Sequence, residues 1–529
     1  MSALALGTWG MTYARTYLIS WLGNSTILRL REDLVSKLQV LSLRYFVEGE
    51  TGQIMSRVTN DTETLSRFLG FEMIEVLSEG VTIFGALFLM FSLNVDLALV
   101  TLLILPVMLL VPLFMRKEMR RVFRRTRTSI ADVTSVLQES VSGMRVVQAF
   151  SRERQDAGVF DTVNVQNLRA NLRASMFMGA FRIGINVTRL TGTVVLLWIG
   201  AAQIVAGNLT VGILIAFQLY LMRFFRPLMH LANFYNHFQE AMAGAERIFE
   251  LLDTEIEVAE PKEDKMITLP KIRGEIKYDQ IAFEYEPQVP VLKDVNLTIS
   301  PNEKVAFVGS TGAGKTTMIN LLCRFYDPQQ GAVMIDGHDL RTVSLKSLRS
   351  QMGIVPQDSF LFQDTVKANI SYGAPQAKDE EIFQAAKIVG AHEFILRLPE
   401  GYDTVIREGG TNISIGQRQL IAFSRALLNN PRILILDEAT SSVDSYTELI
   451  IQKGLEQLLE NRTSIIIAHR LSTVRNADRI LVIEHGEIVE VGNHISLMEK
   501  GGRYSHLYKM QFRDLETKAE SKPEPPSQE

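Results

Sequence analysis

The chain has 529 residues, more than one hydrophobic core of ordinary size accommodates, so several domains are expected. Its net charge of −4 gives no indication of a nucleic-acid partner, and its single cysteine, Cys323, excludes an internal disulfide and a thiolate metal cluster. Cys323 lies in an apolar helical stretch, where inert packing in a core is expected.

Long apolar runs are concentrated in the first half of the chain. A helix that spans a bilayer needs about 20 mostly apolar residues. Four segments meet this requirement, and a weaker fifth at the start of the chain is interrupted by Arg15. In chain order the five are roughly 3–22, 75–92, 97–115, 177–205 and 211–234. Short turns at 93–96 and 207–210 join neighbouring segments, so the sequence predicts two helical hairpins.

Charged residues flank and interrupt these segments. A basic cluster directly after 97–115 marks that side as cytoplasmic by the positive-inside rule. A solvated charged helix face also accounts for the cluster, and both interpretations can hold together. The cluster consists of Arg116, Lys117, Arg120, Arg121, Arg124, Arg125 and Arg127. The following polar stretch, to about residue 175, is too long for a structureless loop, so helices that extend beyond the bilayer are expected there and over 28–69. Ionisable residues inside the spans either face a watery pathway or reach the membrane edge, and both interpretations stay open. They are Glu75, Glu79, Arg182, Arg189, Arg223 and Arg226.

The composition changes after about residue 245. A charged segment with two prolines, 246–272, is interpreted as a linker. Over 273–510, short β-rich runs alternate with helical stretches, which is typical of a largely parallel sheet with helices on both faces. The charged tail 511–529 is expected to be disordered. The sequence therefore predicts an all-α transmembrane helical bundle with long cytoplasmic extensions over 1–245, followed by an α/β domain.

A phosphate-binding loop follows the apolar strand Val305–Val308 and leads into a helix. The segment fits the pattern G-x-x-x-x-G-K-[ST], whose glycines allow backbone N–H groups to surround phosphates at a helix N-terminus. Its residues are Gly309, Ser310, Thr311, Gly312, Ala313, Gly314, Lys315, Thr316 and Thr317. We expect Lys315 to reach the β- and γ-phosphates and the hydroxyl of Thr316 to ligate Mg²⁺.

Two carboxylates end a second apolar strand further along the chain. Asp437 and Glu438 follow Ile433–Leu436 directly. This pattern is weak alone, but with a phosphate loop it predicts that Asp437 holds Mg²⁺, largely through water. Glu438 is then the general base or the residue that orients the attacking water.

Between these elements, Ser414, Gly416 and Gln417 precede a helix and resemble the L-S-x-G-Q signature of the ABC (ATP-binding-cassette) ATPases. The chain has Ile413 and Ile415 where leucine and glycine are usual, and it keeps the polar Ser-x-Gly-Gln atoms, so function is expected to survive. The resemblance extends to four further residues, and it implies that ATP and Mg²⁺ are the cofactors. Tyr285 matches the aromatic residue that stacks on adenine, and Gln357 matches the loop glutamine that contacts Mg²⁺. Asp444 matches a residue of the loop at the dimer interface, and His469 matches the histidine that contacts the γ-phosphate.

The membrane half resembles the exporter branch of this family. The segments 52–61 and 139–153 are similar to the two coupling segments, and 207–212 to the start of the last span, whereas Glu408–Gly410 departs from the usual E-R-G. Exporter halves carry six spans, and the first coupling segment usually starts later than here. The first span and part of the second are therefore expected to be missing. The cause is a misassigned start codon, a fragment or a decayed locus, and a truncated gene model is favoured.

The resemblance implies a dimer, because each ATP would lie between the phosphate loop of one subunit and the signature of the other. The sequence leaves open a homodimer or a related partner half-transporter. It predicts ATP-driven export of a drug-like molecule, lipid or peptide, with membrane lipid as surroundings and no nucleic acid. The expected location is the cell membrane, multi-pass, with the ATPase domain in the cytoplasm. One alternative is a non-functional or regulatory truncated subunit. A non-transport ABC ATPase is a second, but it would lack apolar spans. An importer is a third, but its membrane helices usually lie on a separate chain.

Overall fold

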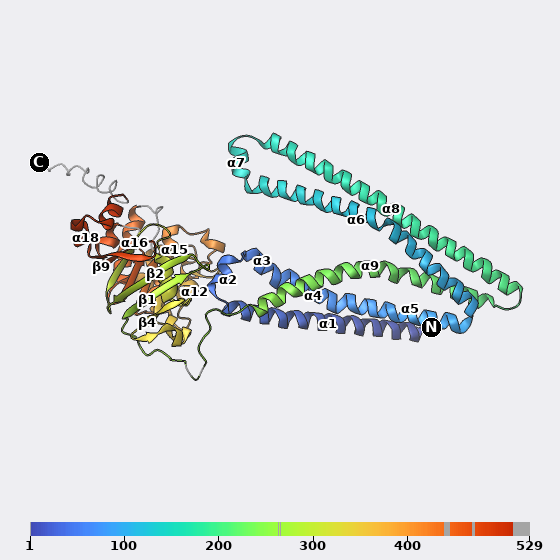
Figure 1. The fold of residues 1–529 in the computed structure, drawn as a ribbon, viewed down its shortest axis with the longest axis horizontal. Coiled ribbons are helices and arrows are strands. Elements are labelled where there is room, and N and C mark those ends of the chain that lie inside the picture. The colour runs from blue at the N-terminus through green and yellow to red at the C-terminus, as the bar shows by residue number, and fades with distance from the viewer. Residues whose placement is uncertain (1, 263, 265, 438–444, 468–470, 511–529) are drawn as a thin grey trace. The chain divides into compact units, whose positions relative to one another are not determined.

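A computed structural model describes residues 2–510 except 263, 265, 438–444 and 468–470 (Figure 1). The chain divides into two compact units. The first contains Met1–Ser36 and Gly52–Asp253, and the second contains Lys37–Thr51 and Thr254–Glu529. The predicted tail 511–529 lies outside the described residues. The short segment Lys37–Thr51 thus packs with the C-terminal unit, although it lies between two helices of the first.

The first unit is helical throughout its described part. Its long helices are α1 (Ser2–Val40), α5 (Met73–Leu93), α6 (Val95–Ser142), α8 (Glu153–Val205) and α9 (Val211–Asp253). Shorter elements are α3 (Thr51–Ser56), the π-helix η1 (Arg57–Asp61), α4 (Thr62–Arg67), the π-helix η2 (Phe68–Glu72) and α7 (Met144–Ala149). Helices cover all five predicted apolar segments, and α6 and α8 also continue far beyond them, as expected.

The two predicted hairpins are present in the first unit. Asn94 alone separates α5 from α6, and its side chain accepts a hydrogen bond of 3.0 Å from the backbone N–H of Leu97, which caps the second helix. Gly207, at φ +78°, lies in the turn between α8 and α9. In Figure 1, α6 and α8 lie side by side and diverge from the other long helices over much of their length.

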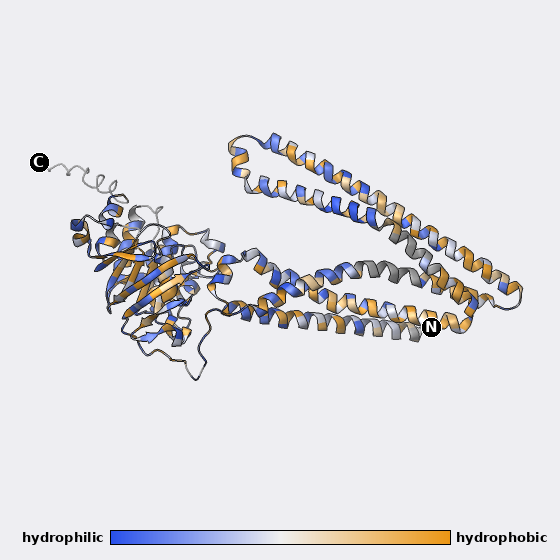
Figure 2. Ribbon diagram, viewed as in Figure 1, coloured by the Kyte–Doolittle hydropathy of each residue, from blue (hydrophilic) through white to orange (hydrophobic). Residues whose placement is uncertain are grey.

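The helices of the first unit carry apolar side chains on their outside. Within the described residues, Thr51–Leu93 and Glu153–Val205 are long and apolar enough to cross a membrane, and Val211–Arg223 is a shorter apolar stretch. Phe84, Phe88 and Trp198 are 75%, 73% and 78% exposed. Figure 2 shows that hydrophobic residues dominate the ends of α5, α6 and α8 around the hairpin turns. Exposed aromatic side chains on apolar helices suit a hydrocarbon surrounding rather than water.

Two ion pairs hold the last turns of α9 in place. The helix supplies the cation to one pair and the anion to the other. The guanidinium of Arg247 donates to both carboxylate oxygens of Asp61, with N–O distances of 2.8 and 2.6 Å. Glu250, one turn later, lies 3.4 Å from Arg57. Both partners come from η1, whose π-helical geometry is often found at functional positions.

The second unit contains two sheets. The antiparallel sheet has the order β2-β1-β4-β5, and the larger sheet has the order β10-β9-β3-β8-β7-β6. The strands are β1 (Ile276–Glu284), β2 (Pro290–Ile299), β3 (Lys304–Val308), β4 (Gln330–Ile335), β5 (His338–Asp339), β6 (Met352–Val355), β7 (Ile433–Asp437), β8 (Thr463–Ile467), β9 (Arg479–Glu484) and β10 (Glu487–Gly492). In the larger sheet all pairs are parallel except β10 with β9.

Helices cover the larger sheet and complete the second unit. They are α2 (Leu43–Glu48), α10 (Lys315–Leu322), α11 (Leu345–Arg349), α12 (Val366–Ser371), α13 (Asp379–Ile388), α14 (His392–Leu396), α15 (Ile415–Leu428), α16 (Ser445–Leu458), α17 (Leu471–Arg475) and α18 (His494–Lys500), with the short 3₁₀-helices η3 (Leu340–Thr342), η4 (Gly401–Asp403) and η5 (Glu408–Gly410). All five residues of β8 are buried, as expected for a central parallel strand covered on both faces. The observed α/β architecture confirms the predicted fold class.

Candidate nucleotide-binding site

The phosphate loop joins a buried strand to the helix α10. Val305, Ala306 and Phe307 of β3 have no exposed surface, so the loop starts from a fixed point in the sheet. A Cβ atom on Gly309 would overlap the carbonyl oxygen of Ile483 on the neighbouring strand β9. Gly314 precedes the helix at φ +107°, a conformation that side chains rarely adopt. The loop therefore needs its glycines for both space and backbone geometry.

Lys315 is held across the loop. Its ammonium group donates to the carbonyl oxygens of Gly309 and Ser310, each at 2.8 Å. Burial lowers the pKa of Lys315, and the nearby charge of Asp437 opposes this shift. The residue thus places a partly desolvated positive charge at the N-terminus of α10, where an anionic phosphate gains from the charge and the helix dipole.

Strand register brings the predicted metal residues to the same edge of the sheet. Asp437 on β7 pairs with Ile467 on β8, which pairs with Phe307 on β3, two residues before the phosphate loop. Gln357 is exposed and follows β6 by two residues, and β6 pairs in parallel with β7. Carboxyl ends of parallel strands meet at one edge, so Gln357 and Asp437 lie at the same edge of the sheet as the loop, both on the β8 side of β3. The predicted catalytic and interface residues Glu438, Asp444 and His469 lie outside the described residues.

The donor set fits Mg²⁺ bound together with a phosphate group. Thr316, in the first turn of α10, is exposed, and Asp437 is half-buried at the end of its strand. No cluster of three His, Cys, Asp or Glu residues suited to a metal occurs in the part of the chain that the structure describes. Mg²⁺ usually takes one or two protein ligands and completes its shell with water and substrate phosphate oxygens. The few oxygen donors here match this pattern.

The ring of Tyr285 is fixed on several sides. Its hydroxyl donates to Oγ1 of Thr317 at 3.2 Å and accepts a bond of 3.1 Å from the side-chain amide of Asn320. The ring of Tyr326 meets it edge-on, with centroids 5.1 Å apart, and Phe283 does so at 4.9 Å. The sequence identified Tyr285 but not Tyr326 or Asn320. Asn320 lies three residues after Thr317 on the same helix, and this spacing is the only local signal that could have indicated Asn320.

The signature segment forms a capped helix start. Ser414 is the N-cap of α15: its Oγ accepts from the N–H of Gln417 at 3.2 Å, and its own N–H donates to Oε1 of Gln417 at 3.0 Å. Ser414 is exposed, whereas Gly416 is buried. Over the described residues, no hydrogen bond or ion pair joins this segment to the phosphate loop of the same chain.

An exposed aromatic surface lies near Gln357 and was not predicted. Phe360 and Tyr372 are 61% and 59% exposed. Arg425 of α15 holds this surface in place, since it donates to the carbonyl of Phe360 at 3.0 Å and to the side chain of Asn369 at 2.9 Å. Such aromatic side chains, fixed but open to solvent, are typical of a surface that binds another protein segment.

Cys323 is inert, as the sequence indicated. It caps the C-terminus of α10, has no exposed surface, and burial raises its pKa to about 12. A thiol with that pKa is not ionised at neutral pH and is a poor nucleophile.

Comparison with known proteins places these features in a family. Residues 1–228 match the ABC transporter transmembrane region and residues 292–441 match the ABC transporter domain. The chain is 41% identical over 510 residues to an uncharacterised ABC transporter ATP-binding protein of Bacillus subtilis, covering 96% of this chain and 84% of that protein. The chain belongs to the ABC transporter family.

Other relatives have names that specify transport. The chain is 40% identical over 512 residues to the ATP-dependent lipid A-core flippase of Syntrophus aciditrophicus, covering 96% of this chain and 84% of the flippase. It is 41% identical over 505 residues to a putative multidrug export ATP-binding/permease protein of Staphylococcus aureus, covering 94% and 86% of the two chains. The structure of a bacterial Atm1-family ABC exporter with ATP bound superposes with a TM-score of 0.76 at 30% identity, covering 96% of this chain and 89% of the exporter. This ABC transporter is an exporter half-transporter, a membrane protein whose ATPase domain drives transport.

Proposed function

We propose that this half-transporter exports a hydrophobic or amphipathic compound, either drug-like, lipid or peptide, across the cell membrane as a dimer, with its ATPase domain in the cytoplasm. The exposed apolar faces of α5 and α8 support a multi-pass membrane position. The names of the relatives, a multidrug exporter and a lipid A-core flippase, support the substrate class.

In the proposed reaction, ATP lies between residues 309–317 of one subunit and Ser414, Gly416 and Gln417 of the other, with adenine on Tyr285. Lys315 neutralises charge on the β- and γ-phosphates. Thr316, Asp437 and Gln357 would hold Mg²⁺, which would supply further positive charge to the phosphate oxygens. Water attacks the γ-phosphorus, its proton passes to Glu438, and the bond to the β-phosphate oxygen breaks to give ADP and phosphate. His469 contacts the γ-phosphate, and Asp444 contacts the partner.

The observation that carries this proposal is the strand register, which aligns Asp437 with the strand that leads into the phosphate loop. The test is the vanadate-sensitive ATPase activity of the purified full chain in lipid vesicles. Glu438→Gln is expected to lower turnover by at least about a hundredfold while ATP still binds, because the proton acceptor is lost. Unchanged turnover would contradict the assignment of Glu438.

The dimer also has a structural rationale. Met144, Val146 and Phe150, on and next to α7, are 41%, 61% and 73% exposed. We propose that α7 of one subunit docks on the aromatic surface around Phe360 and Tyr372 of the other, since both carry exposed apolar side chains. A cysteine pair, Val146→Cys with Tyr372→Cys, is expected to cross-link between subunits. Full ATPase activity of this chain purified without a second gene product would establish a homodimer, and activity that needs a related subunit would establish a heterodimer.

A further inference from the structure

The ring of Tyr285 rests against two buried aromatic rings that also contact each other. Phe283 and Tyr326 are 3% and 5% exposed, whereas Tyr285 is half-buried. The centroids of the two buried rings lie 5.7 Å apart, and both rings lie edge-on to Tyr285, at 4.9 and 5.1 Å. Edge-on aromatic pairs favour one mutual orientation, so the orientation of Tyr285 depends on that of Tyr326.

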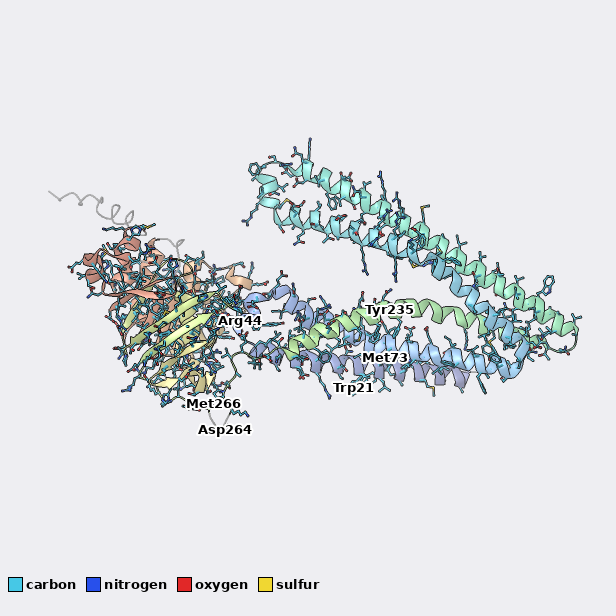
Figure 3. The ribbon with its side chains drawn as sticks, viewed as in Figure 1. Trp21, Arg44, Met73, Tyr235, Asp264 and Met266 are labelled. Carbon is cyan, nitrogen blue, oxygen red and sulfur yellow. The ribbon has the colours of Figure 1, made fainter. Side chains whose placement is uncertain are left out.

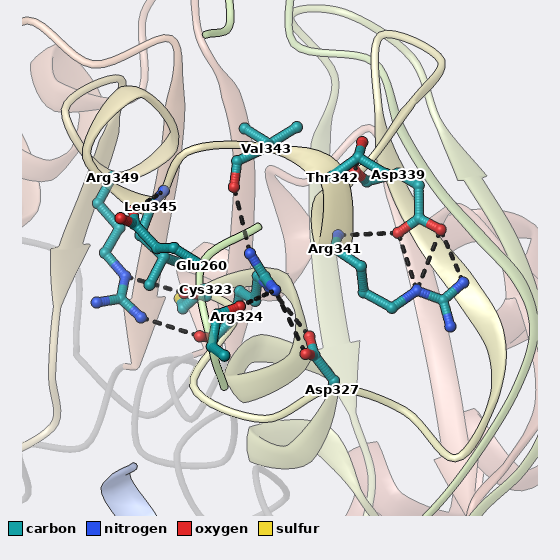
Figure 4. A network of polar contacts seen from close by, with 11 residues as sticks. Glu260, Cys323, Arg324, Asp327, Asp339, Arg341, Thr342, Val343, Leu345 and Arg349 are labelled. Carbon is teal, nitrogen blue, oxygen red and sulfur yellow. Dashed lines mark hydrogen bonds and ion pairs between the residues drawn. The ribbon is translucent and has the colours of Figure 1, made fainter. Parts of the chain in front are cut away.

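The backbone that carries Tyr326 is fixed by Arg324, two residues earlier. Arg324 is 2% exposed and has a φ of +48° in the turn that follows α10. Its guanidinium donates to the carbonyl oxygens of Ala259 at 3.0 Å and Val343 at 3.2 Å, and to the carboxylate of Asp327 at 3.1 Å (Figure 4). These bonds hold the turn in place, so the freedom that remains to Tyr326 is rotation of its side chain.

Arg44 of α2 packs over the ring of Tyr326. Its segment, Lys37–Thr51, belongs to the same compact unit as the nucleotide site. The guanidinium carbon of Arg44, a residue labelled in Figure 3, lies 5.9 Å from the centroid of that ring. Burial and the neighbouring Tyr285 raise the pKa of the Tyr326 phenol, and the charge of Arg44 opposes this shift. The cation therefore interacts with this tyrosine by charge as well as by contact.

The other polar contacts of Arg44 within the described residues are weaker. Its carboxylate partners Glu257 and Glu48 lie at 3.4 and 4.0 Å and are 41% and 68% exposed, and exposed ion pairs stabilise little. Its Nε is buried and donates no hydrogen bond to any described residue. A buried N–H without a hydrogen bond is costly, and a neighbouring aromatic face compensates part of that cost. The ring of Tyr326 is therefore the main partner of the guanidinium, and the two glutamates orient it.

We propose that Arg44 is a positioning residue for the nucleobase. Through Tyr326 it holds Tyr285 in the orientation that stacks on adenine, and it thereby sets the affinity for ATP without taking part in hydrolysis. This inference rests on the proposed function, in which Tyr285 binds adenine. The base lies at the opposite end of the nucleotide from the phosphates, so loss of Arg44 raises KM and leaves kcat nearly unchanged.

The first test measures the ATPase rate of the full-length chain in lipid vesicles against ATP concentration. Arg44→Met keeps an apolar stem but removes the cation, and it is expected to raise KM about two- to fivefold with kcat within about twofold of wild type. Arg44→Lys, which keeps a cation, should recover part of the loss. The matched control is Arg341→Met, because Arg341 is bound to a carboxylate, that of Asp339 at 2.7 Å, rather than to a ring. Its KM should equal that of wild type.

Tripolyphosphate separates the base end of the site from the phosphate loop, because it has three phosphates and no base. Its inhibition constant against ATP is expected to stay within about twofold of wild type in Arg44→Met, which would also show that the phosphate loop is folded in this variant. An equal loss of affinity for ATP and tripolyphosphate would indicate a general disturbance of the domain and would contradict the proposal.

A double-mutant cycle tests whether Arg44 acts through Tyr326. In the Tyr326→Leu background the ring is absent, so adding Arg44→Met should raise KM no further. In Tyr326→Phe, which keeps the ring, the effect of Arg44→Met should persist. An unchanged KM in Arg44→Met, or effects of Arg44→Met and Tyr326→Leu that multiply, would overturn the proposal. A wild-type chain that binds neither ATP nor tripolyphosphate would instead refute the proposed function and, with it, the role of Arg44.

Discussion

Replacing Arg247 with alanine is expected to destabilise the membrane unit, because it removes both hydrogen bonds of a nearly buried carboxylate. The side chain of Asp61 is 11% exposed, whereas that of Arg247 is 46% exposed. Breaking a fully buried ion pair costs about 3–5 kcal/mol, and a hydrogen bond to a charged group is worth about 1.5–3 kcal/mol. Because water can reach the space left by Arg247, we expect a loss of about 2 kcal/mol.

The assay is thermal unfolding of the purified chain in detergent. For a unit of this size, about 2 kcal/mol corresponds to a fall of roughly 4–8 °C in the unfolding midpoint. Glu250→Ala is the matched control, because Glu250 is 67% exposed and lies 3.4 Å from Arg57, so its loss should cost less than about 1 kcal/mol. Asp61→Asn, which keeps an acceptor for Arg247, should fall between the two. If Arg247→Ala lowered the midpoint no more than Glu250→Ala, the bidentate pair would not stabilise the helix end as reasoned.

Three further changes test the nucleotide site. Gly309→Ala is expected to abolish binding of a fluorescent ATP analogue, because the added Cβ overlaps the carbonyl oxygen of Ile483; binding at the wild-type level would show that the loop adapts. Tyr326→Leu removes the ring that lies 5.1 Å from that of Tyr285, so an ATP titration of the ATPase should show KM raised about two- to tenfold with kcat nearly unchanged. Cys323, whose pKa burial raises to about 12, should resist N-ethylmaleimide at pH 8 in the native chain and react only after unfolding; mass spectrometry of labelled peptides would reveal any earlier reaction.

The parts of the site that the sequence predicted are those encoded locally. The phosphate loop needs a strand, glycines and a helix start in one continuous segment, so its pattern can be read without knowing the fold. Tyr326 lies far from Tyr285 in the sequence and meets it only when β1 and the end of α10 pack together. The predicted hairpins were likewise local, because an apolar run, a short polar turn and another apolar run lie next to one another.

The charged segment after residue 245 shows why composition alone is ambiguous. Its charges and two prolines predict a linker, but its first part, 246–253, forms the last two turns of α9, which runs to Asp253. Arg247 and Glu250 lie one turn apart and pair with Asp61 and Arg57, so the charges serve one face of a helix. A charged helix face and a charged linker have the same composition, and only partners elsewhere in the chain distinguish them.

The same reasoning separates the phosphate-binding residues of this transporter from its long-range contacts. Residues that bind phosphate act on a ligand common to many proteins, so evolution preserves a short pattern that sequence analysis detects. Residues that join distant parts of the same chain have no such ligand in common: Asp61 and Arg247 are 186 residues apart, and Arg324 and Ala259 are 65 apart. Neither pair belongs to a pattern by itself, and one of the four partners is a backbone carbonyl that any residue could supply.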